Sequence, residues 1–131
     1  MKVVVDTNVL IRAVVRDDRT QASAAIKVLK NAELIVIALP CLCEFVWVLN
    51  SAYDFPPVDI ASAIRTLLAT ANVKTNRPAV EAGLAMLEAG GDFADGIIAY
   101  EGSWLGGETF VSFDKKAVTR LTALGKSARL I

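Results

Sequence analysis

The stretch Lys2-Val3-Val4-Val5-Asp6-Thr7-Asn8-Val9-Leu10 determines how the fold begins. In it, a short run of apolar β-branched residues ends in a carboxylate, and a helix-like segment follows. This order predicts a buried strand that brings Asp6 to the edge of a sheet, where parallel α/β proteins bind their ligands. An aspartate at this place either caps the following helix or serves as a metal ligand, and the two alternatives imply different functions.

Strand-like and helix-like segments alternate along the rest of the chain, with no linker, repeat or low-complexity stretch. Strands are predicted at residues 3–5, 34–37, 73–74, 109–112 and 128–131. Helices are predicted at residues 8–15, 20–30, 40–53, 57–70, 78–89, 92–105 and 114–124. We therefore expect an α/β fold, a single domain over residues 1–131, with a mostly parallel central sheet and helices on both faces.

The composition excludes several kinds of chemistry. The chain has no histidine, which removes the commonest general base, any catalytic triad that uses histidine, and the commonest zinc ligand. Lysine plus arginine equals aspartate plus glutamate, at 14 each, so a nucleic-acid partner would have to be bound through a local basic patch. Any hydrolytic chemistry is therefore left to the carboxylates.

The cysteines and the hydropathy indicate the setting in which the protein works. Cys41 and Cys43 are the only cysteines and are too close for an ordinary structural disulfide, which favours a reducing, cytoplasmic location. Both are interpreted as small apolar helix residues. Hydrophobic residues make up 54% of the chain, which predicts a large core or an oligomer interface. No run is long enough to span a membrane, and no secretory signal is expected.

Four further acids stand out by their positions. Glu44 lies inside an apolar helix, where it either faces solvent or meets a cation or polar cluster. Asp92 and Asp95 are three residues apart at a helix start, so both carboxylates fall on one face. Capping and the helix dipole also favour acids at those two positions. Asp114 repeats the pattern of Asp6, because it follows one strand and precedes a helix.

Taken together, these acids indicate a metal site. Asp6 and Asp114 close separate strands at what we expect to be the same edge of a parallel sheet. Carboxylates gathered at one edge would repel one another and raise each other's pKa, and a divalent cation resolves that conflict. Mg²⁺ or Mn²⁺ prefers oxygen ligands, which matches a set of acids without histidine.

At this point the chain resembles a known family, the PIN-domain ribonucleases, and specifically the VapC-type toxins of bacterial toxin–antitoxin pairs. Four segments carry the resemblance and occur in the family's order: residues 5–10, 42–49, 92–99 and 111–114. They spread over nearly the whole chain, and its length suits a single compact PIN domain. The resemblance implies a parallel sheet with helices on both faces.

The resemblance also carries roles over by position. It makes four acids the catalytic, metal-binding residues, with Mg²⁺ or Mn²⁺ as the cofactor: Asp6, Glu44, Asp95 and Asp114. It adds a supporting set near them: Thr7, Asn8, Asp92 and Ser112. Ser112 stands where threonine is common in the family, and it keeps the hydroxyl.

The implied activity is an endoribonuclease in which metal-activated water cleaves RNA phosphodiester bonds and so inhibits translation. The resemblance also implies a homodimer and neutralisation by a VapB-type antitoxin protein, with no membrane partner. Substrate binding would need local cations, and the nearest to the acids in sequence are Arg12, Arg16, Lys115 and Lys116. Each of the four also has the simpler interpretation of a solvated surface charge.

Three other interpretations compete with a ribonuclease. A catalytically silent PIN fold would only bind a partner, and the intact acid set argues against it. A receiver-like phosphoacceptor signalling domain needs an aspartate that ends a strand in mid-chain, whereas Asp54 and Asp59 flank Pro56-Pro57. A haloacid-dehalogenase-like phosphatase needs a second aspartate two residues after the first, where this chain has Asn8.

Overall fold

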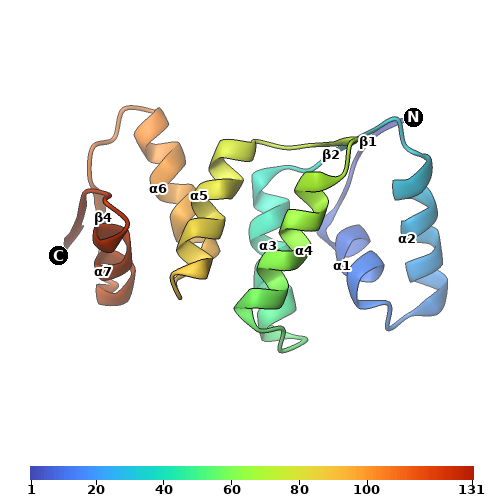
Figure 1. The fold of residues 1–131 in the computed structure, drawn as a ribbon, viewed down its shortest axis with the longest axis horizontal. Coiled ribbons are helices and arrows are strands. Elements are labelled where there is room, and N and C mark those ends of the chain that lie inside the picture. The colour runs from blue at the N-terminus through green and yellow to red at the C-terminus, as the bar shows by residue number, and fades with distance from the viewer. The chain divides into compact units, whose positions relative to one another are not determined.

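The structure, a computed structural model, describes all of residues 1–131 as seven helices and five strands (Figure 1). In chain order they are β1 (Lys2–Val4), α1 (Thr7–Val15), α2 (Arg19–Asn31), β2 (Leu34–Val36), α3 (Leu39–Ser51), α4 (Pro57–Ala69), β3 (Val73–Lys74), α5 (Arg77–Glu88), α6 (Phe93–Trp104), β4 (Phe110–Ser112), α7 (Lys115–Ala123) and β5 (Ala128–Leu130). Every predicted strand and helix is present, with small shifts at the ends. The α/β class is therefore confirmed.

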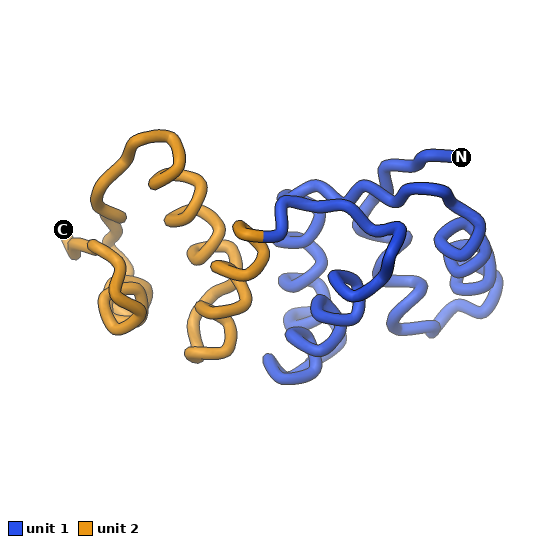
Figure 2. Tube along the Cα trace, turned by 45° about the horizontal axis from the view of Figure 1, so that its top comes forward, with its two compact units in different colours: residues 1–77 blue, residues 78–131 orange.

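The chain divides into two compact units, which we call the N-terminal unit (Met1–Arg77) and the C-terminal unit (Pro78–Ile131) (Figure 2). The N-terminal unit contains a three-stranded sheet in the order β1-β2-β3, and the C-terminal unit contains a two-stranded sheet of β4 and β5. All three pairings are parallel, as predicted. Hydrogen bonds therefore join β1, β2 and β3 into one sheet and β4 and β5 into a second sheet.

In the N-terminal unit, the middle strand lies in the core. Ile35 of β2 is buried and pairs in register with Val3 of β1 on one side and Val73 of β3 on the other. Helix α1 packs against α2 and α3, and α3 packs against α4, where Figure 1 also shows the two side by side. Phe45 of α3 and Ile64 of α4 are fully buried, so the apolar faces of these helices supply much of the core.

The first strand is less buried than the sequence predicts. Val5 is only 6% exposed, but Val4 is 75% exposed and Val3 is half-buried. Successive side chains of a strand point to opposite faces, so Val3 and Val5 lie on one face and Val4 on the other. β1 is also an end strand of its sheet, hydrogen-bonded to β2 alone. A run of three valines does not reveal whether one face or both faces of the strand are covered by other parts of the protein.

In the C-terminal unit, glycine allows α5 and α6 to pack closely. A Cβ atom on Gly96 would lie 2.5 Å from the carbonyl oxygen of Ala82, and one on Gly83 would lie 2.8 Å from the ring of Phe93. Phe93 itself is fully buried at the start of α6. This contact holds the first turn of α6 against α5 and so fixes the backbone that carries the two acids at residues 92 and 95.

The remaining elements of the C-terminal unit pack on a small cluster formed by Met86, Ala117 and Leu121. Phe110 of β4 and Ala128 of β5 pack against it and are themselves partly buried. Helix α7 is thereby held beside both strands, which places its first turn directly after the end of β4. None of the seven helices has the length and apolar character that crossing a membrane requires.

Candidate metal centre

Asp6 caps the first helix with one of its two oxygens. It is the N-cap residue of α1, and its Oδ1 accepts a hydrogen bond from the backbone N–H of Thr7 at 2.8 Å. Its side chain is exposed, and Oδ2 has no hydrogen-bond partner. The capping interpretation of the sequence is therefore confirmed, and the second oxygen is left for another ligand.

Glu44 lies in the second turn of α3 and is exposed to solvent. Of the two alternatives that the sequence left open, solvent exposure is the one observed. Apolar residues surround Glu44 in sequence, but its near neighbours Leu42 and Phe45 point to the buried side of the helix. Its carboxylate therefore needs no cation to compensate for burial.

The charges of Asp6 and Glu44 both act on the pKa of the Cys41 thiol. Burial raises the pKa of the Cys41 thiol above its usual value, and a hydrogen bond with the hydroxyl of Thr7 lowers it in part. The negative charges of Asp6 and Glu44 raise it further. Both carboxylates thus lie within electrostatic reach of the same half-buried thiol, between the first turns of α1 and α3.

Thr7 and Asn8, the two supporting residues predicted in this region, differ in burial. Thr7, predicted as a supporting residue, is buried and its hydroxyl meets the Cys41 thiol, so it ties α1 to α3. Asn8, predicted in the same role, is exposed. Cys41 was interpreted from the sequence only as a small helix residue. Its position three residues before Glu44, on the same helix face, is the signal that would have found it.

Asp92, Asp95 and Asp114 gather in the C-terminal unit. Asp92 is the N-cap residue of α6, but its side chain makes no capping hydrogen bond. Asp95 lies in the first turn of the same helix and is partly buried. Burial raises the pKa of Asp95, and the charges of Asp92 and Asp114 raise it further. For Asp95, this confirms the prediction that neighbouring carboxylates raise its pKa.

Asp114 repeats the geometry of Asp6. It follows β4 and is the N-cap residue of α7, where its Oδ1 accepts hydrogen bonds from the backbone N–H groups of Lys116 at 2.9 Å and Ala117 at 3.2 Å. Its own N–H donates to the hydroxyl of Ser112 at 2.9 Å. Ser112 therefore holds the backbone at Asp114, and Oδ2 of Asp114 has no hydrogen-bond partner.

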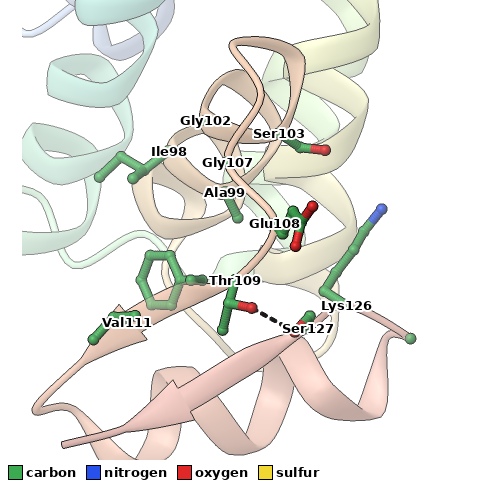
Figure 3. A pocket seen from close by; sticks show the side chains of 12 residues that line it. Ile98, Ala99, Gly102, Ser103, Gly107, Glu108, Thr109, Val111, Lys126 and Ser127 are labelled. Carbon is green, nitrogen blue, oxygen red and sulfur yellow. Dashed lines mark hydrogen bonds between the residues drawn. The ribbon is translucent and has the colours of Figure 1, made fainter.

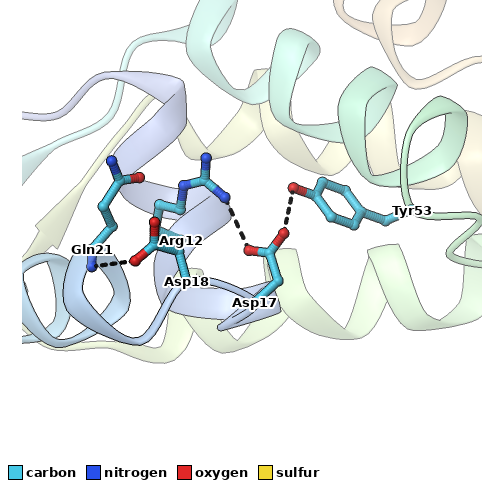
Figure 4. A network of polar contacts seen from close by, with 5 residues as sticks. All are labelled: Arg12, Asp17, Asp18, Gln21 and Tyr53. Atoms are coloured by element: carbon cyan, nitrogen blue, oxygen red, sulfur yellow. Dashed lines mark hydrogen bonds and ion pairs between the residues drawn. The ribbon is translucent and has the colours of Figure 1, made fainter.

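The two predicted arginines already have partners in the N-terminal unit. Nη1 of Arg12 donates to Oδ1 of Asp17 at 2.9 Å, and the hydroxyl of Tyr53 donates to Oδ2 at 3.1 Å (Figure 4). Desolvation acts to raise the pKa of Asp17, but the hydrogen bonds from Tyr53 and Arg12 outweigh it, and the pKa lies below its usual value. Nε of Arg16 donates to the carbonyl of Ala13 at 3.1 Å.

The two predicted lysines are the freer cations. Lys115 and Lys116 are exposed, form no ion pair, and begin α7 directly after Asp114. The positive end of the helix dipole disfavours cations at a helix start, so capping energetics do not explain them. Their position next to a predicted metal ligand makes them better candidates for phosphate contacts than Arg12.

The donor chemistry of these acids suits a hard divalent cation. Every predicted ligand is a carboxylate, and oxygen ligands without histidine or thiolate are those that Mg²⁺ and Mn²⁺ prefer. Asp6 and Glu44 belong to the N-terminal unit, and Asp92, Asp95 and Asp114 to the C-terminal unit. No group of three or more histidine, cysteine, aspartate or glutamate side chains is arranged to hold a metal ion. A metal centre of four acids therefore stays a prediction.

A cavity of about 410 Å³ lies elsewhere in the C-terminal unit (Figure 3). Its wall includes Glu108, Lys126 and the hydroxyls of Thr109 and Ser127, which are hydrogen-bonded to each other at 3.0 Å. None of the predicted acids lines this cavity. The candidate site therefore consists of carboxylates at helix starts and on an exposed helix face, and this cavity is not part of it.

The sequence profile of one family, described as the PIN domain, matches residues 3–121 and so covers most of the chain. The match begins at β1 and ends in α7, and it includes every acid predicted as a ligand. No curated protein matches the chain.

Proposed function

The chain belongs to the PIN domain family, and from this premise we propose that it is a Mg²⁺- or Mn²⁺-dependent endoribonuclease. PIN domains are generally nucleases and usually use divalent metals. The observation that carries the proposal is the carboxylate of Asp95, whose pKa is raised by burial and by the charges of Asp92 and Asp114. None of these three acids forms an ion pair, so a divalent cation would relieve their repulsion.

The residues that would hold the metal are Asp6, Glu44, Asp95 and Asp114, with Asp92 adding negative charge. A bound Mg²⁺ or Mn²⁺ supplies a water of lowered pKa and stabilises the charge that develops on the phosphate. The chain's own part is to hold the carboxylates in place: the N–H groups at the starts of α1 and α7 fix one oxygen each of Asp6 and Asp114. The side chain of Thr7 contacts the Cys41 thiol and so joins α1 to α3. The hydroxyl of Ser112 accepts a hydrogen bond from the backbone N–H of Asp114.

RNA binding would depend on local positive charge because the chain as a whole is neutral. Lys115 and Lys116 are exposed and free of ion pairs, so they can attract a phosphate near Asp114. Arg16 is exposed as well, whereas Arg12 would first have to leave Asp17. With no histidine in the chain, proton transfer falls to the carboxylates and to water.

The test is cleavage of structured RNA by the purified chain with Mg²⁺, with Mn²⁺ and with EDTA. We expect cleavage only with metal, and a loss of about 100-fold or more in Asp95→Asn. Glu101→Gln is the matched control, because Glu101 is an exposed acid on the same helix and belongs to neither predicted set. Activity in EDTA, or full activity of Asp95→Asn, would contradict the proposal.

We further propose that the enzyme is the toxin of a type II toxin–antitoxin pair, resembling VapC, that acts as a homodimer in the cytoplasm and is neutralised by a VapB-type antitoxin. The four motif segments of the sequence support this finer assignment. Expression of the chain alone should arrest growth and translation, and Asp6→Asn should not. A small gene directly upstream should relieve the arrest when it is expressed with the chain. Unimpaired growth with an active nuclease in the cell would exclude the toxin role.

A second candidate function is a catalytically silent PIN fold that only binds a partner. One observation favours it: no three potential ligands are gathered closely enough to hold a metal ion. Calorimetric titration with Mn²⁺ separates the candidates, because a nuclease should bind the ion and lose that binding in Asp95→Asn. An absence of Mn²⁺ binding in the parent would favour the silent protein.

A further inference from the structure

Trp47 is exposed on α3, one helical turn after Glu44. Its side chain is 69% exposed, and no other large hydrophobic residue of α3 is exposed. A spacing of three residues puts Glu44 and Trp47 on the same helix face, about 4.5 Å apart along the axis. A single exposed hydrophobic residue is common in proteins, so its exposure alone means little. Its position beside a predicted catalytic acid is what needs an explanation.

The residues that follow Trp47 on this side of the helix are polar. Asn50 and Ser51, the next residues toward the end of the helix on this side, are both exposed. The hydroxyl of Ser51 donates a hydrogen bond to the carbonyl of Trp47 at 2.6 Å, which fastens the backbone below the indole. Protein–protein interfaces have an apolar centre made of several residues. An indole that is the one exposed large hydrophobic residue of its helix does not match that description.

We propose that Trp47 is a stacking platform for a base of single-stranded RNA next to the bond that the acids cleave. This inference rests on the proposed ribonuclease function. An exposed indole offers a flat π-face that every base can stack on, so it adds affinity without demanding a sequence. A phosphate held near Glu44 and Asp6 would bring a neighbouring base within reach of the same face of α3.

The charge of the chain strengthens the argument for stacking. Lysines and arginines equal the acids in number, and Arg12 is paired with Asp17. A chain with no net positive charge attracts a polyanion less strongly than a basic protein does, so base stacking would contribute a larger share of its affinity. We therefore expect RNA binding by this chain to depend only weakly on salt concentration.

Tryptophan fluorescence tests the proposal directly, because the chain has only two tryptophans, Trp47 and Trp104, and both are exposed. The variant Trp104→Phe leaves Trp47 as the sole emitter, and Trp47→Phe leaves Trp104. Each is titrated with a short unstructured oligoadenylate in Ca²⁺, and the oligonucleotide is checked to be intact afterwards. Stacking predicts quenching in Trp104→Phe and none in Trp47→Phe.

Affinity for the same oligoadenylate gives the second measurement. Trp47→Ser should weaken binding about 10-fold, Trp47→Tyr should keep most of the affinity through its aromatic ring, and Trp104→Ser should bind like the parent. Because Trp47 is exposed, all these variants should fold, which circular dichroism checks. Rescue by tyrosine separates stacking from a merely structural role.

Three outcomes would overturn the inference, and they are distinguishable. If Trp47→Ser binds and cleaves RNA like the parent, the stacking role fails and the ribonuclease stands. If the parent neither binds nor cleaves RNA under any metal condition, both fail. If Trp47→Ser changes the sedimentation coefficient of the protein and leaves RNA affinity unchanged, Trp47 contacts a second copy of the chain and not a base.

Discussion

Asp6 and Asp114 use their two carboxylate oxygens differently. In each, Oδ1 accepts backbone N–H groups at the start of a helix, while Oδ2 has no hydrogen-bond partner. Capping holds the carboxylate in one orientation and leaves lone pairs for another ligand. The two interpretations of Asp6 are therefore compatible. The sequence cannot decide between them, because both need an aspartate in the same place.

Substitutions at Asp6 should separate its two roles. Asp6→Asn keeps an oxygen that can cap α1, so we expect a free energy of unfolding within about 0.5 kcal/mol of the parent. It loses the charge, and RNA cleavage should fall about 100-fold or more. Asp6→Ala should lose both roles and be about 1 kcal/mol less stable. Urea unfolding and RNA cleavage measure the two effects. Equal stability of Asp6→Ala and the parent would show that the cap contributes nothing.

Glu44, Arg12 and Cys41 show what the sequence leaves undecided at the scale of single residues. The neighbours of Glu44 in sequence are apolar, yet the helix directs its side chain to solvent. Arg12 stands near the acids in sequence but pairs with Asp17, because the turn after α1 brings Asp17 back beside it. A cysteine is an ordinary residue inside a helix, so the sequence does not single out Cys41. Its contact with Thr7 becomes visible only in the folded protein. Each outcome depends on contacts between side chains that the spacing does not specify.

At the scale of elements, the close packing of α5 and α6 depends on Gly96. A methyl group there would lie 2.5 Å from the Ala82 carbonyl oxygen and 2.9 Å from the Cβ of Met86, and backbone cannot move aside cheaply. We expect Gly96→Ala to lower the free energy of unfolding by about 1–3 kcal/mol. Because Asp95 is the preceding residue, RNA cleavage should fall as well. Chemical denaturation of the variant measures the first effect.

Gly102 is the matched control on the same helix. A Cβ atom added there meets nothing within 4 Å, and its backbone is helical. Alanine favours a helix over glycine, so Gly102→Ala should raise the free energy of unfolding by about 0.5–1 kcal/mol. If both glycine variants changed stability in the same direction, crowding between α5 and α6 would not be the cause at Gly96.

The contact of Tyr53 with Asp17 joins the turn after α3 to the turn between α1 and α2 (Figure 4). The pKa of Asp17 is lowered from 3.8 in the folded protein, since the hydrogen bonds from Tyr53 and Arg12 outweigh desolvation. A lowered pKa contributes stability that is complete above 3.8 and is lost as the pH falls through the folded value. The contribution is small because Asp17 is exposed.

The variant Tyr53→Phe tests this contact. It should be less stable than the parent near neutral pH, and the difference should shrink as the pH falls below 3.8, where the carboxylate becomes protonated. Urea unfolding at neutral and acidic pH measures the difference. Tyr100→Phe, which removes a hydroxyl from a partly buried tyrosine of α6, is the control and should show no such pH dependence. A difference that stays constant with pH would exclude Asp17 as the partner.

The bounds of the elements follow closely from the sequence. Prolines and glycines mark the starts of α4 and α5 and the ends of α5 and α6, because they restrict or free the backbone at those points. The burial of β1 does not follow, since Val4 is exposed although its sequence neighbours are equally apolar. Which face of a strand is covered depends on packing partners that are distant in sequence.

At the scale of the whole molecule, alternating strands and helices are enough to predict the α/β class and the parallel pairing. Parallel neighbours need a crossover connection, and the intervening helices provide it. The grouping of the strands into three and two does not follow from that alternation, because it depends on which distant segments form hydrogen bonds. The family match over residues 3–121 takes in β1 to β4 and ends before β5.

The central proposal is that the predicted acids Asp6 and Asp95 serve one metal-dependent reaction. RNA cleavage with Mn²⁺ by Asp6→Asn, Asp95→Asn and the double variant tests it most directly. Residues that serve one metal act as a unit, so each single variant should lose about 100-fold and the double variant should lose no more than that. Losses that multiply to about 10,000-fold, or cleavage that persists in EDTA, would contradict the claim.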